Sequence, residues 1–258
     1  MNALCRLHDV RITLGQNRFG PFSLSIHQGE RIAILGPSGA GKTTLLRLIS
    51  GDLRPHSGLH EFKGAPIQAW SLPVLSRGRA VLPQSSDVAF GLVVYLVIGL
   101  GRIAITGDWR RDEIVRHAAH LSACEHLLNR GFDTLSGGEK ARVHLARVFA
   151  QLWDEQNGLI LVDEPLASLD PGLQITLLES MRQFADERHH AIVAILHDIN
   201  QAMHHFERLI LVRQGNLVGD HASGVSAISD LAALYQIQVD VIERDGMPPL
   251  VFPTASLG

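Results

Sequence analysis

Four runs dominated by apolar residues divide this chain of 258 residues, at 31–35, 158–162, 191–196 and 208–212. Runs of this length, in which apolar and polar positions do not alternate, are typical of strands that are buried on both faces of a parallel sheet. A segment at 140–150 instead repeats apolar residues at helical spacing. The pattern predicts an α/β protein, in which ligands bind beyond the carboxyl ends of the strands.

Smaller elements fill the remaining sequence. Residues 10–14 alternate as a half-buried strand, and Gly215 followed by Asn216 indicates a hairpin turn after the run 208–212. A helical region at 225–235 predicts a small accessory structure in the tail. The most apolar window, 88–101, has 14 residues. It is too short to span a bilayer comfortably, and a buried core segment is its simplest interpretation.

Residues 36–43 read Gly-Pro-Ser-Gly-Ala-Gly-Lys-Thr, a complete phosphate-loop motif between the apolar run 31–35 and a helix-like segment. Its glycines allow backbone N–H groups to close around phosphate oxygens, while Lys42 reaches the outer phosphates and the Thr43 hydroxyl ligates Mg²⁺. The motif therefore predicts that the chain binds a nucleoside triphosphate. The residues expected at this site are Gly36, Pro37, Ser38, Gly39, Ala40, Gly41, Lys42, Thr43 and Thr44.

A second glycine-containing motif, Leu-Ser-Gly-Gly-Glu at 135–139, precedes the helical segment 140–150. Adjacent glycines at a helix start are locally unfavourable, and they make sense if an anion must approach the N–H groups there, with the Ser136 hydroxyl as a further donor. The alternative is a simple capping box, with Ser136 as N-cap and Glu139 at the third helical position.

Two buried runs end in residues that can carry chemistry. Asp163 and Glu164 follow the run 158–162, and His197 follows the run 191–196. Carboxylates at the end of a buried strand are costly unless they are used. Asp163 fits the carboxylate that anchors Mg²⁺, and Glu164 is placed to orient and polarise an attacking water.

Together these motifs make the chain resemble the ATP-binding subunits of ABC transporters over nearly its whole length. The Walker A motif corresponds to 36–43, the signature to 135–139, Walker B to 159–163 and the D-loop to 168–170. Gln84 matches the Q-loop, Glu164 the catalytic glutamate and His197 the switch histidine.

The resemblance implies a phosphate-loop ATPase fold, with a RecA-like core, an N-terminal antiparallel β subdomain and an inserted α-helical subdomain. It implies one nucleotide-binding domain over residues 1–258. Its ATPase core with the accessory tail would occupy about 1–84 and 157–258, and the helical subdomain with the signature about 85–156.

In this family two ATPase subunits face head to tail, so the resemblance implies a homodimer in which one subunit's signature covers the neighbour's ATP. The nucleotide-binding set then extends to Ser136, Gly137, Gly138 and Asp170. Glu164, His197 and Gln84 are the implied catalytic residues, and Thr43, Gln84 and Asp163 the implied ligands of Mg²⁺.

The resemblance also implies further partners and a location. The region after Gln84 is where family ATPases receive a helix of the membrane permease dimer, so 88–101 is a candidate for that contact. A substrate-binding protein outside the membrane is an indirect partner. The chain is expected as a peripheral subunit on the cytoplasmic face of the plasma membrane.

The chain departs from the family pattern in three places. Leu14 occupies the position where relatives carry an aromatic residue that stacks on adenine; Phe19 is a possible substitute, or it simply packs on the sheet. Leu166 stands where a small hydroxyl residue is usual, with little effect expected. Tyr95 and Leu96 replace acidic residues at the permease contact, which changes the polar part of that contact.

Composition agrees with this interpretation. Lys and Arg total 23 against 26 acidic residues, a net charge of −3 that argues against a nucleic-acid partner held mainly by phosphate contacts. The first eight residues lack the pattern of a secretory signal, and two cysteines are too few for a disulfide framework. A reducing cytosol is the compartment expected.

The cargo is indicated by resemblance alone. Residues 70–84, 99–102 and 145–153, with Phe90, resemble the ATPases of haem importers, which belong with those for ferric siderophores and vitamin B12. Haem import is the favoured function, with the other two cargoes as alternatives. A soluble ABC ATPase of DNA repair or translation would usually carry two cassettes or a coiled-coil insertion, and a regulatory module without hydrolysis would be expected to lack Glu164 or His197.

Overall fold

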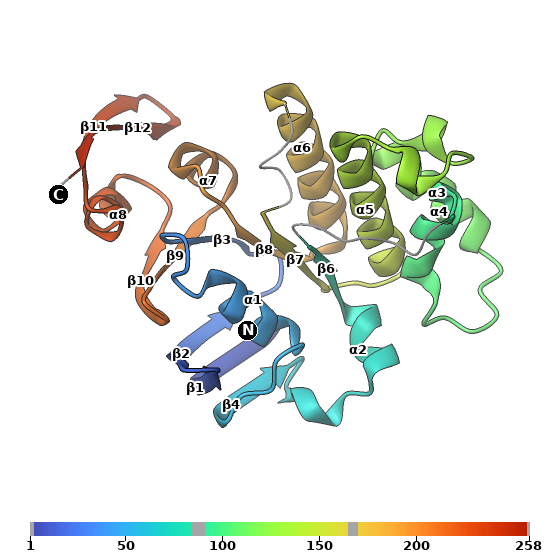
Figure 1. Ribbon diagram of the computed structural model, residues 1–258, viewed down its shortest axis with the longest axis horizontal. Helices are drawn as coiled ribbons and strands as arrows, with labels where there is room; N and C mark the ends of the chain where they lie inside the picture. The colour runs from blue at the N-terminus through green and yellow to red at the C-terminus, as the bar shows by residue number, and fades with distance from the viewer. Residues whose placement is uncertain (1–2, 84–90, 165–169, 257–258) are drawn as a thin grey trace. The chain divides into compact units, whose positions relative to one another are not determined.

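The computed structural model describes residues 3–83, 91–164 and 170–256. The chain forms two compact units, of which the first combines Met1–Ala69 with Ile192–Gly258 and the second is Trp70–Ala191. Figure 1 labels their helices and strands along the chain. Because the first unit is assembled from both ends of the sequence, the N-terminal and C-terminal segments share one core.

An antiparallel sheet begins the first unit, with the strand order β2-β1-β4-β5. Its strands are β1 (Cys5–Leu14), β2 (Asn17–Ile26), β4 (Ser57–Phe62) and β5 (Ala65–Pro66). The alternation predicted at 10–14 is confirmed, because Val10 and Ile12 are buried while Arg11 and Thr13 are exposed. The period of two therefore places one face of β1 in the core.

The first unit also contains a second group of strands, in the order β10-β9-β3-β8. The phosphate-loop motif 36–43 follows β3 of this group. The strands β3 (Arg31–Leu35), β8 (Ala191–Ile195) and β9 (Arg208–Arg213) are parallel, and β10 (Asn216–Ala222) pairs antiparallel with β9. The helices α1 (Lys42–Ser50) and α7 (Ile199–His205) follow β3 and β8. The predicted buried parallel strands 31–35, 191–196 and 208–212 are therefore confirmed.

The turn between β9 and β10 lies one residue earlier than predicted. Arg213 pairs with Asn216, so the two turn residues are Gln214 and Gly215, and both have positive φ angles, of 49° and 77°. Two positive φ angles are the requirement of a tight hairpin turn, and Gly215 satisfies the second without strain.

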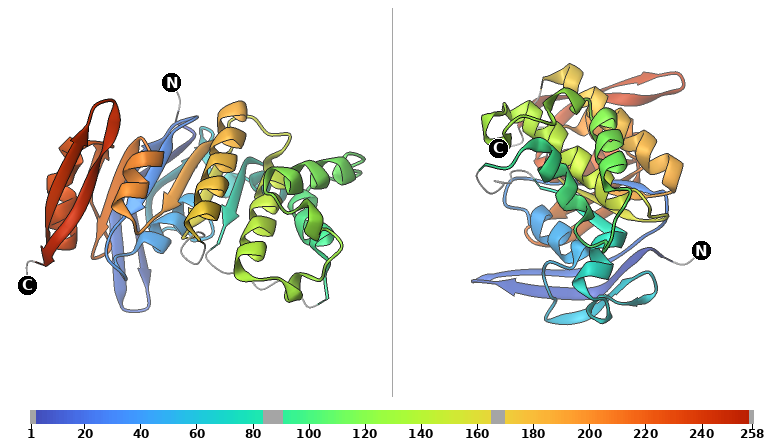
Figure 2. Two further views of the ribbon diagram at one scale, coloured as in Figure 1. Left: turned by 90° about the horizontal axis from the view of Figure 1, so that it is seen from above. Right: turned by 90° about the vertical axis from the view of Figure 1, so that its right-hand side faces the viewer.

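The tail, residues 225–256, contains a helix and a two-stranded hairpin. A 3₁₀ turn (Val225–Ala227) leads into α8 (Ile228–Tyr235), and β11 (Ile237–Arg244) pairs with β12 (Met247–Ser256) as a long antiparallel hairpin. Figure 2 shows this hairpin as a twisted pair of strands beside α8. The predicted helical region at 225–235 is confirmed, whereas the hairpin was not predicted.

The second unit contains two parallel strands, β6 (Arg79–Leu82) and β7 (Leu159–Asp163), with the helices α2 (Leu72–Gly78) and α6 (Pro171–Arg188). Its other helices are α3 (Val94–Gly99), α4 (Arg111–Leu121) and α5 (Gly137–Leu152), which pack on one another as Figure 2 shows. Short 3₁₀ turns connect them at Leu100–Arg102, Glu125–Leu127 and Phe132–Thr134, and another, Ile67–Ala69, closes the first segment of the first unit.

The helical group of the second unit is fastened by a buried guanidinium. Arg102 is 3% exposed and donates to both oxygens of Asp108 at 2.8 and 3.1 Å, to Asp154 at 2.7 Å and to the Ala150 carbonyl at 3.2 Å. A buried charge is costly unless it is paired and hydrogen-bonded, and here several acceptors surround it. Arg102 therefore ties α5 to the segment that enters α4.

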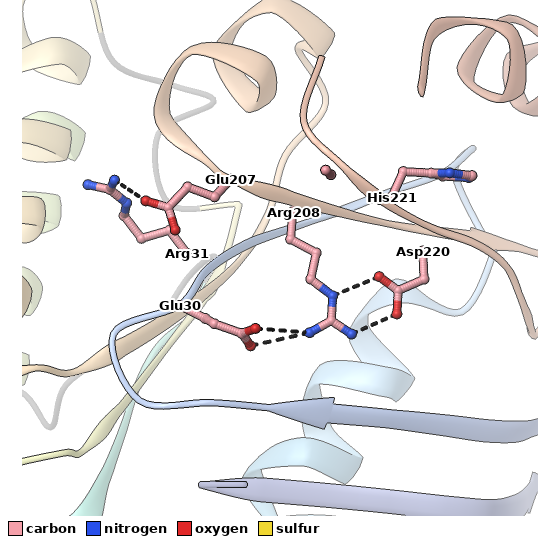
Figure 3. A pocket seen from close by; sticks show the side chains of 7 residues that line it. Glu30, Arg31, Glu207, Arg208, Asp220 and His221 are labelled. Atoms are coloured by element: carbon pink, nitrogen blue, oxygen red, sulfur yellow. Dashed lines mark hydrogen bonds and ion pairs between the residues drawn. The ribbon is translucent and has the colours of Figure 1, made fainter. Parts of the chain in front are cut away.

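A charged pocket of about 280 Å³ lies in the first unit, at the amino ends of β3 and β9. Figure 3 shows Arg208 between two carboxylates, donating to Asp220 at 2.7 and 2.6 Å and to Glu30 at 3.2 Å. Arg208 also donates to the Ser25 carbonyl of β2 at 2.8 Å. These bonds hold β2 against β9 and β10, so the charges of the pocket maintain the fold. Its lining residues are Glu30, Arg31, Glu207, Arg208, Asp220, His221 and Ala222.

Among the residues that the structure describes, no helix has the length and apolar character that a membrane span requires. The apolar window 88–101 instead supplies the short helix α3, in which Val94, Val97 and Ile98 are buried. The part of this window before residue 91 lies outside the described residues. The division of the chain into functional subdomains at about 84 and 157 stays a prediction.

His60 on β4 makes the stability of the first unit depend on pH. Its side chain is 2% exposed, and burial lowers its pKa from 6.5 to about 4. Between pH 6.5 and about pH 4, His60 binds a proton in the unfolded chain but not in the folded chain. The free energy of unfolding contributed by His60 is therefore present above this window and is lost as the pH falls through it, by up to about 3 kcal/mol.

We expect His60→Gln to reduce the difference in unfolding free energy between neutral pH and about pH 4.5, measured by denaturant titration. The matched control is His8→Gln, because His8 lies on the neighbouring strand β1 and its side chain is 70% exposed. An equal pH dependence in the wild-type protein and in His60→Gln would contradict the assignment.

Candidate functional site

The phosphate-loop motif connects β3 to α1 in the first unit. The last four residues of β3 are fully buried, which fixes the position at which the loop begins. Gly41 caps α1 in the left-handed conformation, with φ of 102°, and no acidic residue occupies the first turn of the helix. The first turn of α1 therefore has no carboxylate of its own to offset the positive end of the helix dipole, which favours an anion there.

Close packing around the loop explains two of its glycines. A Cβ atom on Gly36 would lie 2.1 Å from the carbonyl oxygen of Val212 in β9. A Cβ atom on Gly41 would lie 2.9 Å from the ring of Phe19. No side chain fits at Gly36, where backbone fills the space. A side chain at Gly41 would have to displace the Phe19 ring and adopt a left-handed backbone, so glycine is favoured at both positions. Gly39 differs, because the space around its Cβ position is open.

The β9–β10 turn supports the loop from the side. The N–H of Gly215 donates to the carbonyl of Ala40 at 2.8 Å, and the carbonyl of Gly215 accepts from the N–H of Gly20 at 2.7 Å. One turn residue therefore joins the loop to β2. Sequence reasoning identified Gly215 only as a turn former and missed this contact.

Lys42 begins α1 and is 6% exposed. Its ammonium group donates to the carbonyl of Gly36 at 2.8 Å and to that of Pro37 at 3.1 Å, so the charge lies over the loop. Thr43 and Ser38 are exposed, and Thr44 is half-buried. The glycine loop, the start of α1 and the Lys42 ammonium group form a set that fits a phosphate chain, and Thr43 adds a hydroxyl oxygen at the start of the helix.

His197 lies on the same edge of the first unit as the loop. β3 and β8 are parallel neighbours, with Ile34 opposite Ile195, so both chains leave the sheet together. His197 is exposed, and Asp198 caps α7 by accepting from the N–H of Gln201 at 3.0 Å. The structure thus brings together Walker A and the predicted switch histidine, as the sequence predicts.

The carboxylates predicted for metal and water lie in the second unit. Asp163 ends β7 after four buried residues, and Glu164 follows with φ of 50°. The left-handed region is uncommon for a residue with a long side chain, and such backbone strain concentrates at functional sites. This conformation was not predicted from the sequence. Both side chains are half-buried.

The signature segment at the start of α5 forms a complete capping box. The Ser136 hydroxyl accepts from the N–H of Glu139 at 3.3 Å, and the Glu139 carboxylate accepts from the N–H of Ser136 at 2.7 Å. These backbone and side-chain hydrogen bonds to Ser136 lower the pKa of Glu139, with Arg130 adding to the effect. The capping box, which the sequence offered as the alternative interpretation, is therefore present in the single chain. Ser136 and Gly137 remain exposed and Gly138 is half-buried, so a role toward a partner's nucleotide stays a prediction.

Asp170 is the N-cap of α6, where its carboxylate accepts from the N–H of Leu173 at 3.0 Å. Gln84, Leu166 and Ser168 lie outside the described residues. Their assigned roles therefore stay predictions, as do the proposed contributions of Gln84 to the metal site and to catalysis.

Phe19 is half-buried, and its ring lies against the backbone of Gly41 and Gly215. The ring thus packs against the loop and the β9–β10 turn. Leu14 is also half-buried, at the end of β1. An adenine contact at either residue stays a prediction.

Known families account for this arrangement. A model described as ABC transporter matches residues 19–167, which include Walker A, Walker B and the signature. The chain belongs to the ABC transporter family. It is 40% identical to the hemin import ATP-binding protein HmuV of Pseudomonas fluorescens Pf0-1, over 92% of this chain and 94% of that protein.

Further relatives agree with the family assignment. The protein of the same name from Escherichia coli O157:H7 is 38% identical over 86% of this chain and 87% of its own length. Among solved structures, a nucleotide-free ATP-binding cassette of an ABC transporter superposes with a TM-score of 0.78 at 20% identity, covering 90% of this chain and 96% of that one. The predicted α/β ATPase fold is confirmed, and as a member of this family the chain is an ATP-binding ATPase.

The packing of Gly36 gives a matched pair of variants. Gly36→Ala places a methyl group on the Val212 carbonyl, and we expect it to lower the free energy of unfolding by about 3 kcal/mol or more and to abolish ATP binding. Gly39→Ala meets only the cost of a positive φ, about 1 kcal/mol. Thermal unfolding and an ATP titration compare the two variants. Equal stability of both would contradict the packing account.

Proposed function

We propose that this chain is the ATP-hydrolysing subunit of an ABC importer for haem. The observation that carries the proposal is the 40% identity, over nearly the whole of both chains, to a protein named for hemin import. The residues at the loop support the ATPase part, since the glycine cradle, the α1 start and Lys42 are complementary to a triphosphate.

We propose that Mg²⁺ is the metal bound by Thr43, Asp163 and Gln84. Thr43 offers a hydroxyl oxygen and Asp163 a carboxylate, which are the hard oxygen ligands that Mg²⁺ prefers, and Gln84 is the proposed third ligand. When bound, Mg²⁺ neutralises negative charge on the phosphates. Lys42 contributes a second positive charge at the loop.

Glu164 is the proposed catalytic base. Its carboxylate would hold the attacking water and accept its proton, while His197 would donate a hydrogen bond toward the terminal phosphate. Gln84 would sense the water and the metal. The strained backbone of Glu164 supports the role, because it fixes where the carboxylate leaves β7.

The proposed partner on the cytoplasmic face of the plasma membrane is a permease dimer. Apolar side chains in the segment after Gln84 support it, since Leu96 is 40%, Leu100 37% and Ile103 81% exposed. Leu96 and Leu100 lie one helical turn apart and so share a face. Apolar surface concentrated in this way is typical of a protein interface. A substrate-binding protein completes the proposed importer.

Two copies of the chain are proposed to close around two nucleotides. The exposed Ser136 and Gly137 at the start of α5 would then face the partner's phosphates. A dimeric ATP-binding cassette bound to ADP and phosphate, 23% identical over 84% of this chain with a TM-score of 0.74, has the same fold. Closure would change the facing of the permease, and hydrolysis followed by phosphate release would reopen the pair.

Glu164→Gln tests the catalytic assignment. We expect this variant to bind ATP, to lose at least about a hundredfold in turnover, and to accumulate closed dimers, because the amide cannot accept a proton from water. The control is Glu179→Gln on the exposed face of α6. Unchanged steady-state hydrolysis in Glu164→Gln would remove the residue from catalysis.

The cargo is tested by uptake. Deleting the gene in its source organism is expected to abolish uptake of labelled haem while sparing ferric siderophore and cobalamin. Complementation with the wild-type gene should restore uptake, and complementation with Glu164→Gln should not. Selective loss of another cargo, or of none, would exclude haem while leaving the ATPase assignment in place.

A further inference from the structure

The tail of the chain touches the nucleotide loop directly. The hydroxyl oxygen of Tyr235, the last residue of α8, accepts a hydrogen bond from the N–H of Gly36 at 3.1 Å. Gly36 is the first residue of Walker A. Its carbonyl accepts a hydrogen bond from the Lys42 ammonium group, and the Val212 carbonyl lies against its Cα. Tyr235 therefore contacts the residue at which the loop begins.

The helix that carries Tyr235 is itself fixed in place. Ile228, Leu231 and Leu234 are buried, and α8 packs against β9 and β11. Asp230 of α8 lies 3.0 Å from His221 of β10. Because the helix is held on its apolar face, the Tyr235 hydroxyl has a defined position. Burial raises the pKa of Tyr235, so its hydroxyl stays neutral at physiological pH.

A second contact joins the tail to the segment of the switch histidine. The Asn200 side chain donates to the carbonyl of Val251 at 3.0 Å and accepts from its N–H at 2.8 Å. This pair of bonds joins β12 to α7, two elements of the first unit that Figure 1 labels. Asn200 lies three residues after His197, on the first turn of α7. The hairpin thus holds the helix that begins beside His197.

We propose that the tail, α8 with the β11–β12 hairpin, positions the nucleotide loop through Tyr235 and the switch-histidine segment through Asn200. Both contacts lie in the first unit and reach the two elements that leave the sheet together. The Asn200 part rests on the proposed role of His197. Neither residue touches the reacting atoms, so both are positioning residues.

The two contacts have different consequences. Loss of the Tyr235 hydroxyl leaves Gly36 without this acceptor, so the loop samples more conformations and binds ATP less tightly. Loss of the Asn200 clamp frees α7 and lowers the fraction of time that His197 is in place. The first change raises KM and Kd for ATP, and the second lowers kcat with little change in KM.

Tyr235→Phe keeps the ring and removes only the hydroxyl. We expect about a three- to tenfold rise in the Kd for ATP, the size of one neutral hydrogen bond, and faster amide hydrogen exchange at Gly36 in the protein without nucleotide. Asn200→Ala is expected to lower kcat by a similar factor with little change in KM. Gln238→Ala, on the exposed side of β11, is the control.

Wild-type Kd and wild-type Gly36 exchange in Tyr235→Phe would overturn the proposal for the loop, and unchanged kcat in Asn200→Ala would overturn it for the histidine segment. The exchange measurement needs no ATP binding. If the unsubstituted chain failed to bind ATP while Tyr235→Phe still accelerated exchange at Gly36, the positioning contact would stand and the proposed function alone would fail.

Discussion

The absence of space for a side chain at Gly36 is the constraint on which the nucleotide site depends. The carbonyl of Val212 occupies the volume that any Cβ atom would need, so β9 and the loop meet backbone to backbone. This close approach lets the β9–β10 turn reach Ala40 and places the Lys42 ammonium on the loop carbonyls. Lys42 and the start of α1 then provide positive potential where the phosphates are proposed to bind.

In the second unit, the signature segment 135–139 satisfies its own local hydrogen bonds. Ser136 and Glu139 complete a capping box, and Arg130 pairs with Glu139 at 2.9 Å. The start of α5 is therefore ordered without a ligand. In the proposed dimer, a partner's nucleotide would meet a helix end that is already ordered, which reduces the entropic cost of association.

The sequence predicted the parts of the structure that depend on local pattern. Continuous apolar runs located β3, β7, β8 and β9, and the loop motif located α1. The strand ends then placed His197 beside Walker A, because parallel neighbours leave a sheet at the same edge. The prediction placed the turn one residue too late, at Gly215 and Asn216 instead of Gln214 and Gly215, because the pairing register of β9 and β10 decides which residues form the turn.

The contacts that the sequence did not predict join distant segments. Tyr235 and Gly36 are 199 positions apart, and Asn200 and Val251 are 51 apart. No local pattern marks a tyrosine as the acceptor for a particular backbone N–H. The left-handed backbone of Glu164 was also missed, because strain of this kind is imposed by surrounding structure rather than by residue preference.

The central claim, that residues 36–43 form the ATP site, is tested most directly by a calorimetric titration of ATP with Mg²⁺ into wild-type protein, Lys42→Ala and the control Lys63→Ala. The account predicts at least about a tenfold loss of affinity for Lys42→Ala, the size of a hydrogen bond from a charged group, and wild-type affinity for Lys63→Ala. Wild-type affinity in Lys42→Ala would contradict the account.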